Sequence, residues 1–515
     1  MKKIIALHDT APAGDSDVRI SALEPTEQGV VINLGFPGTK RNWAVQCLLL
    51  SAMITGCATD TPLYAARAVP AAFEHTPSDG RATWPSEQWY REFSSDELVS
   101  FVEVAAKSNL DLAEARARVA QADARARQAG AAILPSVDAA GNANYLAGHS
   151  SSSGTGHETD WSALLSASYE IDFWGKNRAA ANAARFAAAA SRAERDTLAL
   201  TTLAGVANAY FDLLALRERL AIARSNLDAA RGLLDVIQAR YGAGMASPVD
   251  LATQKAALAT AELVIPDLEQ QQVEARAALA LLLGREPEGF YVKDQSLDAL
   301  SEPKVGAGLP AELLTRRPDI AVAEANLQSA HADLAAARAA LFPSFSLTAG
   351  GGLQNPALNA AVLSLPGTGP TVNLGASVTQ AIFDHGRLRA VRAEAEAKEE
   401  ELLAAYRTAI LSALKDVEAA LAAIHHFDVA RPFQMESLAQ SERAFEGAKL
   451  RYQAGSGDFL ALLEAQRTVY AARDQVARYK LARLQALVGL CKALGGGWQG
   501  SPTAAPATAR AGKTP

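Results

Sequence analysis

Hydrophobic and polar residues alternate with a period of two in four segments of the chain. In residues 161–174, one face carries Trp161, Leu165 and Ile171, whereas the opposite face carries mainly serine and acidic residues. The same alternation occurs in residues 135–147, 344–354 and 371–383. A strand places successive side chains on opposite faces, so each segment is predicted to be a β-strand. The connecting segments are rich in Gly, Ser, Pro or Ala and are predicted to be exposed hairpin loops: residues 148–158 and 355–370.

A helical pattern follows each pair of strands and continues much further than in a globular domain. It begins after Gly175 and after Gly386 and lasts about 65–70 residues, which at 1.5 Å per residue corresponds to about 100 Å. The sequences Tyr241-Gly-Ala-Gly and Tyr452-Gln-Ala-Gly are predicted to end the two helices, because glycine commonly terminates a helix.

A second helix is predicted after each of these glycine turns. One begins after Ser247-Pro248 and the other after Asp458. Serine and aspartate are favoured as N-cap residues, and proline is favoured at the first helical position. The chain is therefore expected to form two helical hairpins whose turns lie about 100 Å from the strands.

The chain contains two copies of one layout. Residues 131–137 (AAILPSV) match residues 339–345 (AALFPSF), and the glycines and tyrosines at the ends of the long helices match at nearly the same offset. Each copy begins with a helix, predicted at residues 96–133 and 318–341, and continues as strand, loop, strand, long helix, turn and helix. A repeat of this length indicates a duplication rather than a solenoid of short units.

The predicted organisation has six parts. These are an upstream segment with a signal peptide (1–56), an N-terminal extended segment (57–95), the first copy (96–290), an equatorial linker (291–311), the second copy (312–494) and a disordered tail (495–515).

Strands with one apolar face and one small, polar face are typical of a membrane β-barrel with a watery interior. Four strands cannot close a barrel, because a useful bore needs about eight or more, and open sheet edges are not tolerated in lipid. Three chains that each contribute four strands would give twelve. The alternative is a soluble β-sandwich, but the strands are too few and too long for that architecture.

Composition narrows the functional classes further. The net charge of −7 offers no reason to expect nucleic acid as a partner, and three cysteines cannot build a disulfide framework. No run of about 20 apolar residues is present, so no membrane-spanning helix is expected. The adjacent pair His425-His426 is assigned to a solvated helix face rather than a metal site, since no cysteine or carboxylate cluster completes it in the sequence.

A shorter apolar run, residues 43–54, follows Lys40-Arg41 and leads to Ile54-Thr-Gly-Cys57. A basic flank, a short apolar segment and small residues are typical of a secretory signal. The ending resembles the lipobox of bacterial lipoproteins, which implies that Cys57 becomes a diacylated N-terminus in the outer membrane. The alternative is a buried helix with an incidental cysteine. Residues 1–39 are polar and patternless, and we interpret them as the result of a misassigned start codon.

Several motifs together resemble the TolC-like outer membrane factors of the OprM/NodT lipoprotein type. The motifs are Tyr169-Glu-Ile-Asp-Phe-Trp-Gly-Lys, Leu314-Thr-Arg-Arg-Pro-Asp-Ile, Ala339-Ala-Leu-Phe-Pro-Ser-Phe-Ser-Leu-Thr, Gln380-Ala-Ile-Phe-Asp-His-Gly-Arg-Leu-Arg, Ala465-Gln-Arg-Thr-Val-Tyr and Gly495-Gly-Gly-Trp. This resemblance covers residues 57–498. It implies an α+β membrane protein and a homotrimer, in which a 12-stranded barrel continues as a periplasmic helical tunnel. It also implies a periplasmic adaptor (membrane fusion) protein and an inner-membrane RND-type pump as partners, and passive export of small molecules.

The resemblance places candidate residues at the helical tips and at the strand–helix joints. The periplasmic aperture candidates are Asp458, Asp250, Tyr452, Tyr241, Arg451 and Arg240. The candidates for adaptor contact are Gly244, Gly455 and Ser247, and the joints are Gly175, Gly386, Pro135 and Pro343. Rings of three inward-facing aspartates would attract cations. The other interpretation is that Asp458 and Ser247 only cap the returning helices, and that the two tyrosines only pack at the helix ends.

Other functional classes have weaker support. The chain has no nucleophile elbow, phosphate loop or metal-ligand spacing, so no catalytic or metal-binding residue and no cofactor beyond the lipid on Cys57 are expected. A periplasmic coiled-coil scaffold or adaptor would explain the helices but not the four strands. A duct for type I protein secretion or for metal efflux would use the same architecture, so the cargo stays open.

Overall fold

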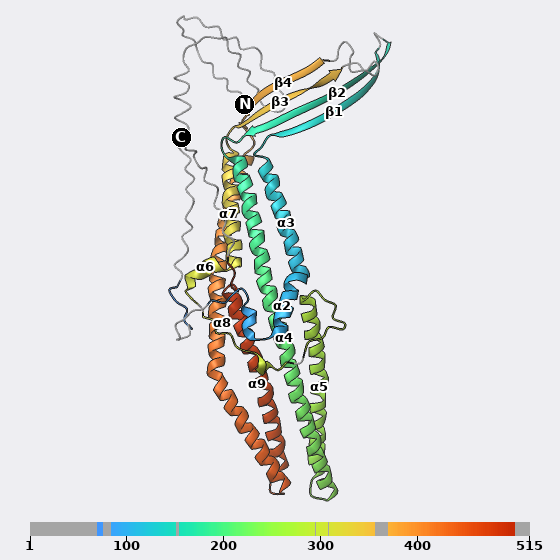
Figure 1. The fold of residues 1–515 in the computed structure, drawn as a ribbon, viewed down its shortest axis with the longest axis vertical. Coiled ribbons are helices and arrows are strands. Elements are labelled where there is room, and N and C mark those ends of the chain that lie inside the picture. Colours follow the sequence, from blue (N-terminus) through green and yellow to red (C-terminus); the bar gives the residue numbers. More distant parts are fainter. Residues whose placement is uncertain are drawn as a thin grey trace, which may run out of the picture.

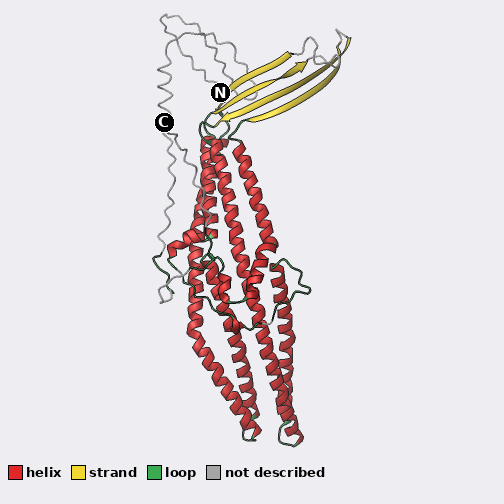
Figure 2. Ribbon diagram, viewed as in Figure 1, coloured by secondary structure: helices red, strands yellow, loops and turns green. Residues whose placement is uncertain are grey.

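The computed structural model describes residues 70–75, 84–150, 154–293, 295–306, 308–355 and 369–499. The described chain is elongated, with one sheet at one end and long helices that run away from it (Figure 1). The turns of the two helical hairpins lie at the end opposite the sheet. No helix covers either face of the sheet in this view (Figure 2).

The sheet contains four antiparallel strands in the order β1-β2-β3-β4. Their bounds are β1 Ser136–Ser150, β2 Gly154–Ile171, β3 Ser344–Asn355 and β4 Gly369–Thr379. The β2–β3 pair joins the two hairpins, with Ser168 opposite Thr348. Each predicted strand is therefore present, and β1 and β4 are the edges of the sheet.

The strand bounds differ from the sequence prediction in both hairpins. Residues 148–150 and 154–158 were predicted as loop, but they extend the ladder until Ser150 pairs with Gly154. At the other end, residues 172–174 and 380–383 were predicted as strand but lie outside it, since the chain turns there towards the helices. Residues 356–368 of the second loop lie outside the described residues.

The helices repeat in length between the two halves. The bounds are α3 Leu110–Ala131 and α7 Pro318–Ala339 (22 residues each), α4 Lys176–Gly242 and α8 Arg387–Gln453 (67 each), and α5 Pro248–Leu282 and α9 Phe459–Ala493 (35 each). The shorter elements are η1 Trp89–Phe93, α2 Asp96–Ser108, η2 Leu297–Ala299, η3 Pro310–Glu312 and α6 Leu313–Arg316. The predicted length of the two long helices is confirmed.

The prediction of one continuous helix over residues 96–133 is wrong. The structure separates α2 from α3 at Asn109, which is extended (φ −61°, ψ 130°) and caps α3 by accepting the Leu112 amide at 3.0 Å. The Asn109 side-chain amide donates to the Leu282 carbonyl at 2.9 Å. Gly284 approaches so closely that a Cβ there would lie 2.3 Å from the Ser108 oxygen. The break is thus produced by tertiary contact with the end of α5.

The main core lies midway along the helices, where α2, α4, α5 and the end of α9 meet. Its largest fully buried side chains include Trp89, Phe93, Tyr210 and Phe211. Phe93 and Phe211 have ring centroids 5.1 Å apart. Burial of each such side chain contributes about 1.5–3 kcal/mol. This core fixes the N-terminal segment to the long helices.

One described helix, α4, is long and apolar enough to cross a membrane by length and composition alone. This helix contains an 18-residue window that passes the test by length and composition, and half of that window is buried within the chain. Core packing explains the apolar composition, because Val206, Leu213 and Leu214 of α4 belong to the main core.

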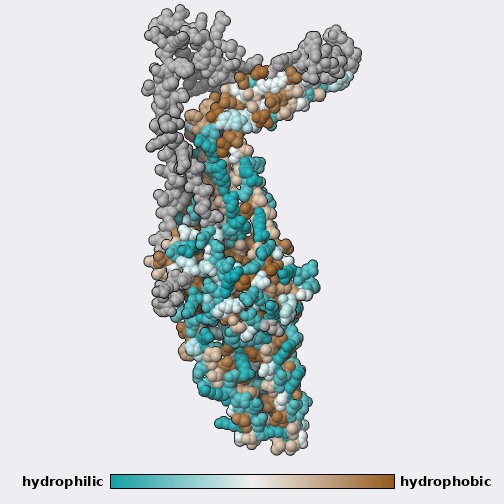
Figure 3. All heavy atoms as spheres, viewed as in Figure 1, coloured by the Kyte–Doolittle hydropathy of each residue, from teal (hydrophilic) through white to brown (hydrophobic). Residues whose placement is uncertain are grey.

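Apolar side chains are exposed along the sheet. Figure 3 shows hydrophobic residues on the strands and near the strand–helix joint, whereas the visible face of the helical body is mainly hydrophilic. Val372 and Leu374 of β4 are 80% and 82% exposed, and Val378 shares their face. A sheet that exposes such side chains needs an apolar surrounding.

Candidate functional site

The candidate site is the end of the molecule opposite the sheet, where the two helical hairpins turn (Figure 1). Gly244 (φ +75°) and Gly455 (φ +78°) follow α4 and α8 in the left-handed region, which only glycine adopts without strain. The amide of Met245 donates to the Arg240 carbonyl at 2.8 Å, and the amide of Ser456 donates to the Arg451 carbonyl at 3.0 Å. Both helices therefore end in the same glycine-dependent turn, as predicted.

The returning helices begin at capped N-termini. Ser247 and Asp250 form a reciprocal capping box: the Asp250 amide donates to Ser247 Oγ at 3.1 Å, and the Ser247 amide donates to Asp250 Oδ2 at 2.9 Å. Asp458 caps α9 by accepting the Ala461 amide at 3.3 Å. The capping interpretation of Ser247 and Asp458 is confirmed, and Asp250 also caps. A role of either aspartate in an aperture stays a prediction.

Arg240 and Tyr452 link the two tips. The Arg240 guanidinium donates from Nη2 to the Tyr452 carbonyl at 2.8 Å and lies 4.3 Å above the centre of the Tyr452 ring. The ring is 4% exposed and packs against Phe459 at 6.2 Å. Ile237 of α4 belongs to the same cluster. A charge-assisted hydrogen bond and a cation–π contact thus hold one hairpin against the other.

The remaining aperture candidates do not join this link. Tyr241 is 44% exposed, and the side chain of Arg451 is exposed as well. Gly457, which the sequence analysis did not single out, is required in the second turn because a Cβ there would lie 2.7 Å from the Tyr452 nitrogen. The second glycine of Gly455-Ser-Gly457 was the available signal.

Glycines also begin the long helices at the strand–helix joints. Gly175 (φ +79°) precedes α4 and Gly386 (φ +84°) precedes α8, so the predicted joint role is supported by a backbone conformation that disfavours other residues. At the opposite joint, the Trp174 indole donates to the Pro343 carbonyl at 2.8 Å and stacks on Phe342. Pro135 lies between α3 and β1.

Two aspartates that the sequence analysis did not assign to the joints cap the long helices there. Asp172 accepts the amides of Asn177 and Arg178 at 3.0 and 2.9 Å. Asp384 accepts the amides of Gly386 and Leu388, both at 3.0 Å. The hydrogen bond from the Leu388 amide is the main reason why the pKa of Asp384 is lowered. An aspartate two or three residues before each joint glycine was the available signal.

Arg317 is a second residue whose role appears only in the tertiary structure. It is 8% exposed and donates to the Ala493 carbonyl at 2.9 Å and to Asp319 at 2.6 Å. It also reaches Asp416 of α8 at 3.3 Å. Arg317 therefore ties the start of α7 to the end of α9 and to α8. Burial disfavours its charge, but the hydrogen bonds and the negative charges of Asp319 and Asp416 together outweigh this, and the pKa of Arg317 is raised.

Several predictions concern the ends of the chain. Cys57 and the predicted signal segment lie outside the described residues. Residues 495–499 were predicted to begin a disordered tail, but they are ordered: Trp498 donates to Asp196 at 3.0 Å. Gly495 is required there, because a Cβ would lie 2.0 Å from the Arg316 oxygen. The predicted extended segment 57–95 contains the short helix η1.

Comparison with known proteins identifies relatives over most of the chain. The family described as "Outer membrane efflux protein" matches residues 101–285 and 309–496. The pyoverdine export outer membrane protein OpmQ of Pseudomonas aeruginosa is 44% identical over 461 residues, which cover 88% of this chain and 96% of OpmQ. The toluene efflux pump outer membrane protein TtgC of Pseudomonas putida is 29% identical over 88% of this chain and 95% of TtgC.

The solved structure of the outer-membrane channel OprN has a similar fold. It superposes with a TM-score of 0.77 at 28% sequence identity, over 84% of this chain and 97% of OprN. Both sequence relatives named above are described as outer-membrane proteins of export or efflux. The fold and the sequence relatives therefore indicate the same class of function.

Proposed function

This chain belongs to the outer membrane efflux protein family and is the outer-membrane channel of an efflux system. We propose that three copies of the chain assemble to form the conduit of this channel. In this proposal the four-stranded sheets of three chains close one 12-stranded barrel, and the long helices continue it as a periplasmic tunnel. An adaptor protein and an inner-membrane pump complete the system.

The open edges of the sheet carry this proposal. Strands β1 and β4 each have a partner on one side only within the described chain, and apolar side chains such as Leu374 are exposed. Each backbone group left without a hydrogen bond in lipid costs several kcal/mol, so the edges must pair with strands of other copies. A head-to-tail ring of three copies pairs β4 of one copy with β1 of the next and leaves no edge.

The helices set the length of the tunnel and place its far end. A 67-residue helix spans about 100 Å. The tips at Gly244, Gly455 and Ser247 would contact the adaptor. The contact between Arg240 and Tyr452 would hold the aperture closed, and Asp250 and Asp458 would each form an acidic ring at its rim.

Native mass spectrometry and planar-bilayer recording of the detergent-purified protein test this proposal together. We expect the mass of a trimer and discrete channel openings. A stable monomer, or a trimer that never conducts even with its adaptor, would favour the alternative of a periplasmic scaffold.

The lipid anchor and the duplication remain proposals of the same kind. We propose that Cys57 carries a diacylglycerol, and intact-mass analysis of wild type against Cys57→Ser would detect its loss. The equal lengths of the helices in the two halves support the proposal that residues 96–290 and 312–494 arose by duplication.

The sequence relatives also suggest a cargo class. We propose that the cargo is a secreted siderophore of the pyoverdine kind, because the export protein OpmQ is 44% identical whereas the solvent efflux protein TtgC is 29% identical. Deletion of the gene should trap siderophore in the periplasm, as fluorescence or mass spectrometry of periplasmic extracts would show. If the deletion strain secretes siderophore normally but becomes sensitive to solvents or metals, or retains a protein that wild type secretes, the cargo is a different one.

A further inference from the structure

A short N-terminal segment, residues 70–75, lies against α8 far from both the sheet and the tips. Phe73 anchors it: the ring is 8% exposed and belongs to a core cluster with Val417 and Leu421 of α8. The two residues after Phe73 are Glu74 and His75. The buried ring therefore fixes two potential metal ligands beside one turn of α8.

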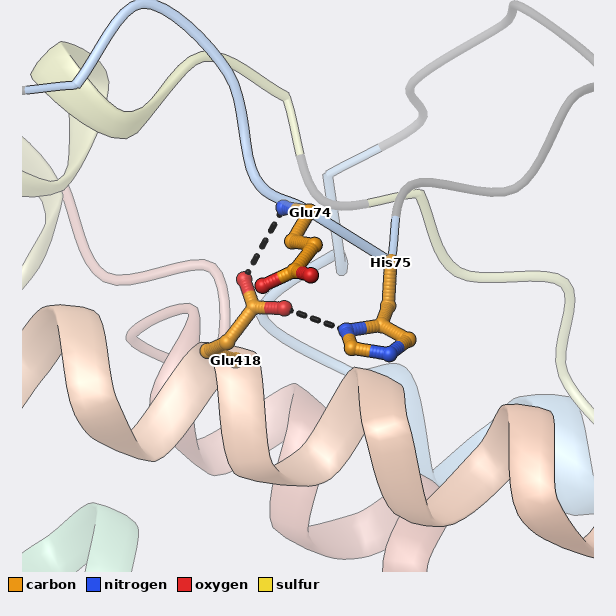
Figure 4. A group of neighbouring side chains, drawn as sticks. All are labelled: Glu74, His75 and Glu418. Atoms are coloured by element: carbon orange, nitrogen blue, oxygen red, sulfur yellow. Dashed lines mark hydrogen bonds and ion pairs between the residues drawn. The ribbon is translucent and has the colours of Figure 1, made fainter.

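Glu418 of α8 lies between these two residues (Figure 4). Its Oε1 is 2.5 Å from Nδ1 of His75, and its Oε2 accepts the Glu74 amide at 3.2 Å. One ligand atom from each of Glu74, His75 and Glu418 lies within 4.8 Å of the others. Three side chains from segments about 340 residues apart in sequence thus converge on one point.

His425 stands next to this group. It lies seven residues after Glu418 on α8, which is two helical turns and the same face of the helix. The ring centroids of His75 and His425 are 6.0 Å apart. The sequence alone offered no carboxylate cluster beside His425, whereas the fold supplies two carboxylates and a second imidazole.

The charges favour a cation at this point. Two carboxylates so close repel each other unless a positive charge lies near both. Imidazole and carboxylate ligands together suit Zn²⁺, Cu²⁺ or Ni²⁺ better than Mg²⁺ or Ca²⁺, which prefer oxygen alone.

We propose that Glu74, His75 and Glu418 form a binding site for a divalent transition metal of the Zn²⁺ class, with His425 as the fourth ligand. Ligand atoms around Zn²⁺ lie about 2.0–2.2 Å from the metal, so the side chains must close in on the bound ion. The bound ion ties segment 70–75 to the middle of α8. The site lies along the middle of α8, away from the sheet and the tips (Figure 1), and the proposal does not depend on the proposed cargo.

Zinc titration of the full-length, tag-free protein in detergent tests the site. After treatment with EDTA, isothermal titration with ZnCl₂ should give one ion per protomer, and MgCl₂ should give no heat. The variants His75→Ala and Glu418→Gln should each weaken binding at least tenfold, and His425→Ala should weaken it less. His426→Ala is the matched control, because His426 packs against Phe427 instead, and its affinity should equal that of wild type.

A structural measurement distinguishes loss of zinc binding from loss of folding. Glu418→Gln keeps an oxygen that can accept the Glu74 amide, so its circular dichroism and oligomeric state should match wild type. Zinc should slow hydrogen exchange in residues 70–75 of wild type but not of this variant. Absence of zinc binding to wild type, or binding that both His75→Ala and Glu418→Gln leave unchanged, would overturn the proposal and leave an ion pair between His75 and Glu418.

Discussion

The outgoing helices of the two hairpins have the same length but are packed very differently. Helices α4 and α8 both contain 67 residues, yet α4 contacts α3, α5, α7 and α9, whereas the main helical neighbours of α8 are α7 and α9. Buried residues occur along most of α4, but in α8 they are confined to Ile410, Ala413, Val417, Leu421, Ser441 and Tyr452. Equal length therefore does not imply equal stability within one chain.

The prolines sharpen this contrast. Pro432 lies inside α8, the outgoing helix of the second hairpin, whereas Pro266 lies inside α5, the returning helix of the first. A proline inside a helix removes one backbone hydrogen bond and permits a kink. Large apolar side chains near Pro432 are also exposed, with Phe433 at 73%. Within the described chain, α4 is the more deeply buried of the two long helices, whereas α8 leaves more of its surface open to neighbours.

The largest effect is expected from equivalent truncations in the two long helices. Phe211→Ala removes a fully buried ring and should destabilise the protomer by about 3–5 kcal/mol. Phe433→Ala should change the protomer by less than about 0.5 kcal/mol. Thermal unfolding of the dissociated protomer, followed by circular dichroism in detergent, measures both. Equal losses would mean that α8 is as firmly packed as α4.

Removal of the link between the hairpins should have the next largest effect. Arg240→Ala deletes the hydrogen bond to the Tyr452 carbonyl and the cation–π contact, which together contribute about 1–3 kcal/mol. Channel open probability in planar bilayers should rise about tenfold, since about 1.4 kcal/mol corresponds to that factor. Arg451→Ala is the control and should leave it unchanged. If both variants behave alike, the link does not hold the aperture.

A smaller effect is expected at the caps of the returning helices. Ser247→Ala and Asp458→Ala should each cost about 1 kcal/mol of local stability. Ser247 belongs to a reciprocal box, so its loss should speed hydrogen exchange over residues 247–250, whereas loss of Asp458 should speed it mainly at Ala461. Equal exchange in wild type and variants would show that neither cap is needed.

The smallest effect concerns pH at the start of α8. The lowered pKa of Asp384 means that its capping is fully present above the unfolded value of 3.8 and is lost as the pH falls through the lower folded value. The protection factors of the Gly386 and Leu388 amides, which compare the observed exchange rate with the intrinsic rate at the same pH, should therefore fall at acidic pH in wild type. In Asp384→Ala these protection factors should be low at every pH, and a retained pH dependence of protection in that variant would assign the titration to another group.

Much of this fold could be predicted from local pattern. The alternation of apolar and polar residues with a period of two identified the strands. The change to a helical period identified α4 and α8 to within a few residues. Glycine, serine and proline at the turns predicted the tips, because these residues satisfy local backbone requirements. Ser247 and Asp458 cap as expected since an N-cap depends on residues only three positions away.

The errors and omissions have a common origin. The break at Asn109 depends on Leu282, the roles of Arg317 depend on Ala493 and Asp416, and Tyr452 is linked to Arg240 across more than 200 residues. No local pattern predicts which side chains distant segments bring together. His425 is exposed, as predicted, but only the tertiary structure brings its ring to 6.0 Å from that of His75 in the N-terminal segment 70–75.

The sequence by itself determined the elements of this protein: four amphipathic strands, two helices of 67 residues, and the turns between them. These follow from periodicity and backbone preference, which act over a few residues. Only the tertiary structure decided that α4 is buried while α8 is left exposed, and that Arg240 reaches Tyr452. Those outcomes depend on packing between residues far apart in the chain, where the gain from burial, rather than local propensity, selects the contacts.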